Sequence, residues 1–386
     1  MKKFEYRKRV LIITPFCKPN IGGAETLLED YTNYLRKNGY FVYIQTYQPI
    51  TTEGVSWQSY EKDKNIEVFR HHWFGFNLFH KLENYPIFNF FYLVPGLLFH
   101  SFIFLIRNKE KVDVIDAQGF ASSCIAWVLR KFFHKKTIVT VVSLYEFGKK
   151  PIYAKMIYWL IKDFDHIVTE SHKSKQEIID LGIQPEKITP FNEWVDLKRF
   201  KPVDKAESKE KIGWRNRFIV LFVGRAIPVK GADILLEAAK KVDQKITFAF
   251  ISGAGPQIEL LTKADKENEN IVFVGRVPYD RLHLYYQAAD LFAIPSRYEE
   301  NVARTMIEAI ACGTPVIASN MGAIPQVLDE TVSILIKPTA ENFSREIQKL
   351  YDNPKRLSSL QKNCQPYAQK HFSDKNAQEI ADCYDK

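Results

Sequence analysis

Hydrophobic residues occur along this chain in short runs that alternate with segments of helical period. The run Arg9–Thr14 (RVLIIT) is apolar over nearly its whole length, which predicts a strand buried on both faces. The segment from about Ala24 to Asn38 is predicted to be a helix that ends at Gly39, where glycine favours a left-handed turn. A strand followed by a helix in this way is the beginning of a βαβ unit.

The same alternation continues through both halves of the chain. Further strands are predicted at 41–46, 112–116, 137–143, 166–169, 218–223, 246–251, 271–274, 291–294 and 316–318. A polar, charged stretch from 198 to 217 interrupts the pattern. We therefore predict an α/β fold with two doubly wound, Rossmann-like domains, residues 1–197 and 198–365, with a C-terminal helix (366–386) that joins the first. In such sheets ligands bind beyond the carboxyl ends of the strands.

The segment 296–319 (SRYEENVARTMIEAIACGTPVIAS) contains a loop, a helix predicted from Val302 to Cys312, and a strand. Gly313 suits the left-handed residue that follows a helix, and Pro315 prevents continuation. On this helix Glu308 lies one turn after Arg304. By itself, an Arg–Glu pair at this spacing is more typical of a solvated helix surface than of a site.

The stretch 87–106 (IFNFFYLVPGLLFHSFIFLI) is long and apolar enough to suggest a membrane span. Pro95 and Gly96 at its centre, together with several polar residues, argue against a simple span. The sequence leaves three alternatives open. They are a buried or groove-lining helix pair, a surface that docks on a membrane, and a true span.

Composition narrows the class of protein. The chain is 46% hydrophobic and 26% charged, which is typical of a globular protein, and its net charge is +9. Residues 1–200 carry 28 Lys and Arg against 21 Asp and Glu. This half could attract a phosphorylated substrate or an anionic membrane face; nucleic acid is less favoured, because no zinc-finger or RNA-recognition signature is present. Five scattered cysteines, none in a CxxC pair, favour a reducing, cytoplasmic setting.

Three loops that follow predicted strands could hold a phosphorylated ligand. The first contains Gly22 and Gly23 and opens a helix, whose free N–H groups favour anions. The second, Val223–Gly231, carries two cations that could clamp a diphosphate, Arg225 and Lys230. The third contains Gly253 and Gly255. Each of these patterns is weak alone, because Gly-rich turns and solvated cations are common.

No motif for a nucleophilic serine, a zinc protease or a P-loop is present. Asp163-Phe164-Asp165 matches a metal-binding DxD formally, but the pattern fits a helix end that runs into the strand 166–169 better. We therefore expect no metal and no cofactor.

Taken in order, the motifs resemble those of the family 4 retaining glycosyltransferases, which have the GT-B architecture. The similarity covers nearly the whole chain and is most specific in 218–319. The motifs that carry it are GGAE after the first strand, VGRAIPVKG, SGAGP, FVGRVP, EENVARTMIEAIACGTPVIAS, the junction segment PFNEWVDLKRF, and DVIDAQG and DHIVTESHKSKQEIIDLG in the first half.

The resemblance implies roles for individual residues. Glu300 and Glu308 match the family's pair of glutamates separated by seven intervening residues, which implies that Glu300 contacts the donor sugar and Glu308 the ribose hydroxyls. Arg225 and Lys230 would hold the donor diphosphate, with backbone N–H groups near Gly23. Further donor contacts would come from Gly22, Gly253, Gly255, Asn301 and Val302, and from the main chain near Val277, which would contact the nucleobase.

The chain departs from the family where a histidine is frequent in the sugar site. Val142 and Ser143 stand after the strand that ends at Thr140, and Gln118 occupies another position where histidine is common. Ser143, Glu146 and Gln118 are therefore only candidates for the sugar and acceptor site.

The expected activity is metal-independent, retaining transfer of a hexose from a nucleoside diphosphate sugar to a glycan or lipid-linked acceptor, as in cell-surface polysaccharide synthesis. The basic first half and the stretch 87–106 suggest peripheral association with the inner face of the cell membrane, and no nucleic acid partner. Two alternatives are a nucleotide-sugar epimerase of the same architecture, which would need no acceptor, and a non-catalytic nucleotide-sugar-binding module.

Overall fold

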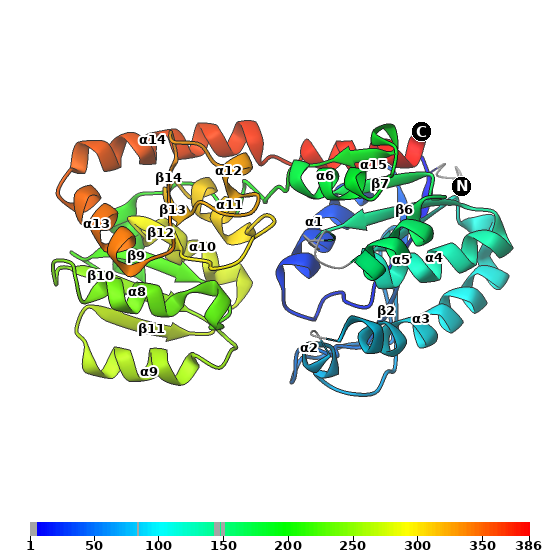
Figure 1. The fold of residues 1–386 in the computed structure, drawn as a ribbon, viewed down its shortest axis with the longest axis horizontal. Helices are drawn as coiled ribbons and strands as arrows, with labels where there is room; N and C mark the ends of the chain where they lie inside the picture. Colours follow the sequence, from blue (N-terminus) through cyan, green and yellow to red (C-terminus); the bar gives the residue numbers. More distant parts are fainter. Residues whose placement is uncertain (1–5, 83–84, 143–146, 148–150) are drawn as a thin grey trace. The chain divides into compact units, whose positions relative to one another are not determined.

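The computed structural model describes residues 6–82, 85–142, 147 and 151–386. The chain forms two compact units: unit 1 comprises residues 1–191 and 375–386, and unit 2 comprises residues 192–374 (Figure 1). Each unit is a largely parallel sheet with helices on its faces, so the predicted α/β class is confirmed.

Unit 1 contains an eight-stranded sheet in the order β3-β4-β2-β1-β5-β6-β7-β8, parallel except for the antiparallel pair β3 and β4. Its strands are β1 (Arg9–Ile13), β2 (Phe41–Tyr47), β3 (Tyr60–Asp63), β4 (Ile66–His71), β5 (Val114–Gln118), β6 (Lys136–Val141), β7 (His166–Thr169) and β8 (Ile188–Pro190). Its helices are α1 (Gly23–Lys37), α2 (Leu78–Lys81), α3 (Pro86–Asn108), α4 (Gly119–Phe133), α5 (Pro151–Ile161), α6 (His172–Asp180) and α15 (Asn376–Asp385). The strand order reverses between β1 and β5.

The apolar stretch of the first half forms one continuous helix, α3, and not the helix pair that was one of the three alternatives. Pro95 lies inside it, and Gly96 lets the Trp73 ring approach the helix so closely that a Cβ there would lie 2.3 Å from the ring. The segment Ile87–Lys111 is long and apolar enough to cross a membrane, but so is the core helix of many soluble proteins. Part of it belongs to the core: Leu93, for example, is 4% exposed.

Unit 2 contains a six-stranded, all-parallel sheet in the order β11-β10-β9-β12-β13-β14. Its strands are β9 (Phe218–Val223), β10 (Ile246–Ile251), β11 (Ile271–Gly275), β12 (Leu291–Ile294), β13 (Val316–Ser319) and β14 (Ser333–Ile336). Its helices are α7 (Lys205–Lys211), α8 (Ala232–Ala239), α9 (Ile258–Glu267), α10 (Tyr279–Ala288), α11 (Arg304–Ala311), α12 (Ile324–Val327), α13 (Ala340–Tyr351) and α14 (Pro354–His371). The strand order reverses between β9 and β12, and doubly wound sheets bind their ligands at this point.

The division between the units differs from the predicted one at both junctions. The segment 192–197 packs in unit 2, where the Val195 N–H donates to the Phe372 carbonyl at 3.2 Å. Helix α14 also stays in unit 2, so only α15 returns to unit 1 instead of the whole of 366–386. There the Tyr384 hydroxyl donates to the buried carboxylate of Asp116. Tertiary contacts at these two junctions decide where the boundary between the units falls, and charge composition does not predict those contacts.

Candidate active site

The candidate site in unit 2 is formed by two loops that follow β9 and β12, the strands on either side of the point where the sheet order reverses. Lys230 lies in the loop after β9, and Glu300 lies in the loop after β12. The Lys230 Nζ atom is 2.6 Å from Glu300 Oε1. A cation and a carboxylate that are 70 residues apart in the sequence therefore meet at the edge where this fold binds ligands.

The Glu300 carboxylate is almost fully buried, with 6% of its side chain exposed. Its Oε1 accepts hydrogen bonds from the Lys230 ammonium and, at 2.6 Å, from the Ser296 hydroxyl, while its Oε2 accepts from the Tyr298 hydroxyl at 2.7 Å. A carboxylate has about four acceptor positions, and three take these donors. The group is held rigidly and keeps capacity on Oε2 for one further hydroxyl donor.

Two features bring the loops after β9 and β12 together. Gly231 has a φ of +73°, and a Cβ at this position would lie 2.1 Å from the Pro295 carbonyl oxygen, so only glycine permits the approach. Arg297 forms a two-pronged ion pair with Asp233, at 2.7 and 2.6 Å. Burial alone would raise the pKa of Asp233, but hydrogen bonds from Arg297 and Gln257 outweigh it and lower that pKa.

Sequence patterns did not predict a place in the site for Ser296, Tyr298, Arg297 or Asp233. The signal that could have found Ser296 and Arg297 is their place just after Pro295, which follows the buried strand β12. For Asp233 no local signal exists, because its partner lies 64 residues further on.

The loop after β10 packs against the loop after β9. The Ala226 N–H donates to the Ala254 carbonyl at 2.8 Å, and a Cβ at Gly255, whose φ is +129°, would lie 2.3 Å from the Ala226 carbonyl oxygen. Gly253 lies against the Arg276 side chain. Arg225 is exposed, and its guanidinium has no ion pair within the described part of the chain. Two of the three predicted phosphate-binding loops are therefore adjacent in space.

Val277, Asn301 and Val302 are half-buried loop residues. Val277 follows β11 and packs on the core of unit 2. Asn301 and Val302 lie between Glu300 and the start of α11. The Glu300 backbone is fixed by Gly322, where a Cβ would lie 2.1 Å from the Glu300 carbonyl oxygen. Their roles in donor binding remain predictions.

The pair Arg304 and Glu308 is buried, so its interpretation as a solvated surface pair is wrong. Only 7% and 2% of these side chains are exposed, and Arg304 Nε is 3.3 Å from Glu308 Oε1. The Arg304 guanidinium also contacts Glu193 at 2.8 Å, and the Tyr286 hydroxyl donates to Glu308 at 2.8 Å. Burial, together with the Glu308 charge, raises the pKa of Tyr286, so the phenol stays a proton donor. Glu308 thus has an internal structural role, and its proposed contact with ribose remains a prediction.

In unit 1 the predicted residues lie after β1 and β5, again on either side of the point where strand order reverses. Gly22 is the N-cap of α1 and Gly23 is its first residue, with open space where a Cβ would be. The loop before them is anchored by the Asn20 Oδ1 atom, which accepts from the Thr51 hydroxyl at 2.8 Å. The first turn of α1 therefore has an accessible glycine backbone.

Gln118 is the last residue of β5, and its Nε2 atom is buried. Ser143 and Glu146 lie outside the described residues. Near this edge the Asp116 carboxylate accepts a hydrogen bond from the Thr140 hydroxyl at 3.1 Å and another from Tyr384. Burial raises the pKa of Asp116 to about 6, although hydrogen bonds from Tyr384, Thr140 and Gln118 act to lower it.

The described residues contain no group of three or more His, Cys, Asp or Glu side chains that could hold a metal ion. The segment Asp163-Phe164-Asp165 lies between α5 and β7, as predicted, with Phe164 fully buried. Asp165 Oδ2 accepts from the Thr137 N–H at 2.8 Å, which is a structural role.

Two family profiles match successive parts of the chain. The profile described as Glycosyltransferase Family 4 matches residues 21–199, and the profile described as Glycosyl transferases group 1 matches residues 204–371. All the site residues that were predicted from the sequence lie within these two ranges. Helix α15 lies beyond them.

Several curated proteins are similar in sequence. The D-inositol 3-phosphate glycosyltransferase of Rhodococcus jostii is 30% identical over 241 residues, which cover 58% of this chain and 53% of that protein. The chain thus spans about half the length of this relative. A component of the phosphatidylinositol N-acetylglucosaminyltransferase of Arabidopsis thaliana is 25% identical over 352 residues, which cover 88% of this chain and 74% of that protein.

Solved structures share the fold at low identity. Sucrose-phosphate synthase from Thermosynechococcus elongatus matches with a TM-score of 0.82 and 21% identity over 98% of both chains. Anabaena HepE, solved with UDP-glucose, matches with a TM-score of 0.75 and 18% identity over 97% of this chain and 99% of HepE. The two Rossmann-like units therefore have the fold of the GT-B glycosyltransferases. The chain belongs to family 4 of these enzymes.

Proposed function

We propose that this protein is a retaining, metal-independent glycosyltransferase that moves a hexose from a nucleoside diphosphate sugar to an acceptor. The observation that carries the proposal is the Lys230–Glu300 pair, which joins the two loops at the ligand-binding edge of unit 2. Arg225, exposed on the loop after β9, adds a second cation for the donor diphosphate. HepE, which was solved with UDP-glucose, has the same fold.

In the proposed reaction, the bond between the sugar anomeric carbon and the β-phosphate oxygen breaks as the acceptor hydroxyl oxygen bonds to the same face of that carbon. The acceptor proton passes to the leaving phosphate. Negative charge grows on the phosphate oxygens, and Lys230 and Arg225 stabilise it more in the transition state than in the ground state. Glu300 holds the Lys230 ammonium in place and accepts a hydrogen bond from a sugar hydroxyl at Oε2.

The donor is identified first by a thermal-shift screen of nucleotide sugars, because a ligand that binds the folded state raises the unfolding temperature. With that donor and a membrane extract as the acceptor source, Lys230→Met should lower kcat/KM by about 100- to 1,000-fold, the usual effect of losing one such contact. The matched control is Lys240→Gln on the exposed end of α8, which should keep full activity. Equal activity in both variants would exclude Lys230 from the reaction. Conversion of the donor without any acceptor would instead indicate an epimerase.

We further propose that the acceptor is anchored in lipid and that unit 1 docks on the membrane. Exposed apolar side chains support this proposal: on α3, Phe88 and Phe91 are 64% and 69% exposed, and on α5, Ile152 and Trp159 are 87% and 54% exposed. Lys162 lies with its ammonium 3.5 Å from the centre of the Trp159 ring, next to this apolar surface. Aromatic rings flanked by lysine suit the interface of an anionic membrane.

The docking proposal is tested by sedimentation with vesicles that contain anionic lipid. Ile152→Ser/Trp159→Ser should reduce the bound fraction several-fold, because two apolar anchors are removed. Leu260→Ser in α9 of unit 2, where the side chain is 43% exposed, is the matched control and should bind like the parent. Transfer of sugar only to water-soluble products, with membranes present, would contradict the lipid-linked acceptor.

A further inference from the structure

Unit 1 contains a cavity far from the edge at which Gly23 and Gln118 lie. It has a volume of about 850 Å³ and is lined by the last turn of α4, the starts of β6 and β7, the residues after α5, and the end of α15. Strand β6 begins at this cavity with Lys136 and runs for six residues toward the ligand-binding edge. The cavity is therefore roughly 17 Å from that edge, at the opposite end of the sheet.

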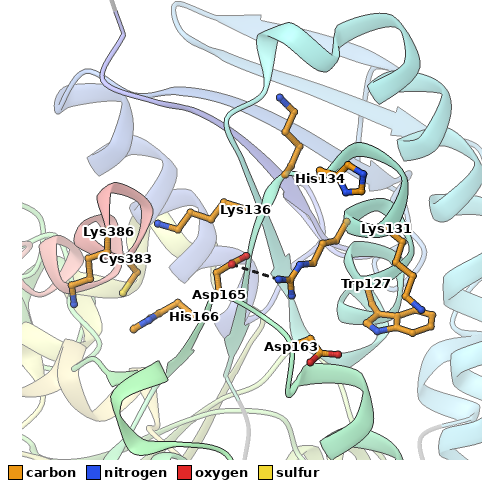
Figure 2. Close-up of a pocket in the computed structure, with 11 residues that line it drawn as sticks. Trp127, Lys131, His134, Lys136, Asp163, Asp165, His166, Cys383 and Lys386 are labelled. Atoms are coloured by element: carbon orange, nitrogen blue, oxygen red, sulfur yellow. Dashed lines mark ion pairs between the residues drawn. The ribbon is translucent and has the colours of Figure 1, made fainter.

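The cavity is lined by more positive than negative side chains. Five cations surround it, Arg130, Lys131, Lys135, Lys136 and Lys386, against the two carboxylates of Asp163 and Asp165. Figure 2 shows Lys136 and Lys386 on one side of Asp165, and Trp127 and Lys131 on the other. Like charges that converge on one cavity repel one another unless an anion lies between them.

The two carboxylates of the lining are too few to balance its five cations. Asp165 uses its Oδ2 for the Thr137 N–H and hydroxyl, and its Oδ1 forms an ion pair of 3.6 Å with Arg130 Nη2, which is too long for a hydrogen bond. The ammonium groups of Lys131 and Lys135 have no ion-pair partner within residues 6–82, 85–142, 147 and 151–386.

The Lys136 ammonium and the Arg130 guanidinium are partly shielded from water, and neither has a full set of hydrogen-bond partners. The Lys136 ammonium donates to the Tyr384 carbonyl at 3.2 Å, and burial lowers its pKa. Arg130 Nη1 is buried without a hydrogen-bond partner among the described residues. Favourable interaction with the C-terminal end of α4 accounts in part for Arg130 and Lys131, because cations stabilise that end of a helix. It does not account for Lys135, Lys136 or Lys386, which lie beyond the last turn of that helix.

We propose that this cavity, the α4–β6–α15 pocket, binds a phosphate group. Arg130 would donate two N–H groups to phosphate oxygens, which suits its planar geometry, while Lys135 and Lys136 would supply point charges. The phosphate could belong to a soluble phosphorylated metabolite or to an anionic lipid headgroup, and the chemistry of recognition is the same. Binding here is independent of sugar transfer, because the pocket lies at the opposite end of the sheet from the predicted sugar site of unit 1.

The test measures binding of inorganic phosphate and glycerol 3-phosphate to the whole protein by calorimetry. In parallel, it measures binding to phosphatidylcholine vesicles with and without phosphatidic acid. Arg130→Gln/Lys135→Gln removes two pocket charges and should weaken binding at least tenfold in whichever arm binds. The control Lys37→Gln/Lys64→Asn removes two exposed charges of unit 1 away from the pocket and should change binding less than twofold. Asn suits position 64, where φ is +54°.

The outcomes separate the two sources. Pocket-dependent binding of the soluble phosphates indicates a metabolite, and pocket-dependent binding of phosphatidic acid vesicles alone indicates a lipid headgroup. Binding is also measured for Arg225→Gln. A loss of binding in this variant would show that the loops of unit 2 hold the phosphate instead. No binding in either arm, or equal losses in the pocket and control variants, would overturn the proposal even if the protein is an active glycosyltransferase.

Discussion

The buried cluster of Glu193, Arg304 and Glu308 in unit 2 leads to a quantitative prediction. Arg304→Met keeps the length of the side chain but removes the only guanidinium described between two carboxylates, each with 2% of its side chain exposed. Breaking a buried ion pair by removing one partner costs about 3–5 kcal/mol, because the remaining charge has lost its water without keeping its partner. A surface pair would cost below about 1 kcal/mol.

For a unit of 183 residues, from 192 to 374, this loss should lower the unfolding temperature by roughly 6–20 °C. Scanning calorimetry of the whole protein resolves the effect on unit 2. Arg281→Met on the exposed face of α10 is the matched control and should shift the transition by at most a degree or two, the effect of about 0.5 kcal/mol.

A second variant separates loss of charge balance from loss of packing. Arg304→Met/Glu308→Gln removes one of the two stranded carboxylates, and it should therefore regain part of the stability that Arg304→Met loses. If Arg304→Met were no more destabilising than Arg281→Met, the cluster would be solvated, and the structural role assigned to Glu308 would be wrong.

Two further predictions concern stability. Gly231→Ala should lower the free energy of unfolding by more than the roughly 1–2 kcal/mol of left-handed strain, because the added Cβ would also displace the Pro295 carbonyl. Gly213→Ala, where φ is +75° and the space around the residue is open, should lose the strain energy alone. Equal thermal midpoints for the two variants would show that the loops after β9 and β12 do not pack as described. The pKa of Asp116 is about 6 in the folded protein, against an ordinary value of 3.8, so the folded state binds this proton more tightly than the unfolded state does. The free energy of unfolding should therefore fall by about 3 kcal/mol as the pH rises from about 4 to 6. Asp116→Asn should abolish that fall in urea unfolding measured at pH 4 and pH 7, and an unchanged pH dependence would contradict it.

Much of the fold could be predicted because buried parallel strands are nearly continuous apolar runs. Strands β7, β9, β10 and β12 have the predicted bounds, and α1 is displaced by only one residue. Four strands were missed. Of these, β3 is an exposed, charged edge strand (YEKD), and β8 has only three residues, so neither carries a strong apolar pattern.

The candidate site was predictable only as a set of loops. Glycines and cations directly after strands marked Arg225, Lys230, Gly253 and Gly255, since such loops share one edge of a parallel sheet. Nothing local in the sequence indicated that Lys230 would contact Glu300, because strand order decides which loops are neighbours.

The sequence by itself determined the alternation of strands and helices, the presence of two sheets and the family, because these depend on local patterns of apolar residues and on ordered motifs. Tertiary structure alone decided the environment of the charges. Arg304 and Glu308 have the spacing of a surface pair, yet they are buried because α11 packs against α10, α14, β12 and β13. Four of the five cations of the α4–β6–α15 pocket lie within residues 130–136, but only folding brings Lys386 and the carboxylates of Asp163 and Asp165 to the same cavity. Solvation and pairing of charge depend on what surrounds a side chain, which linear spacing does not specify.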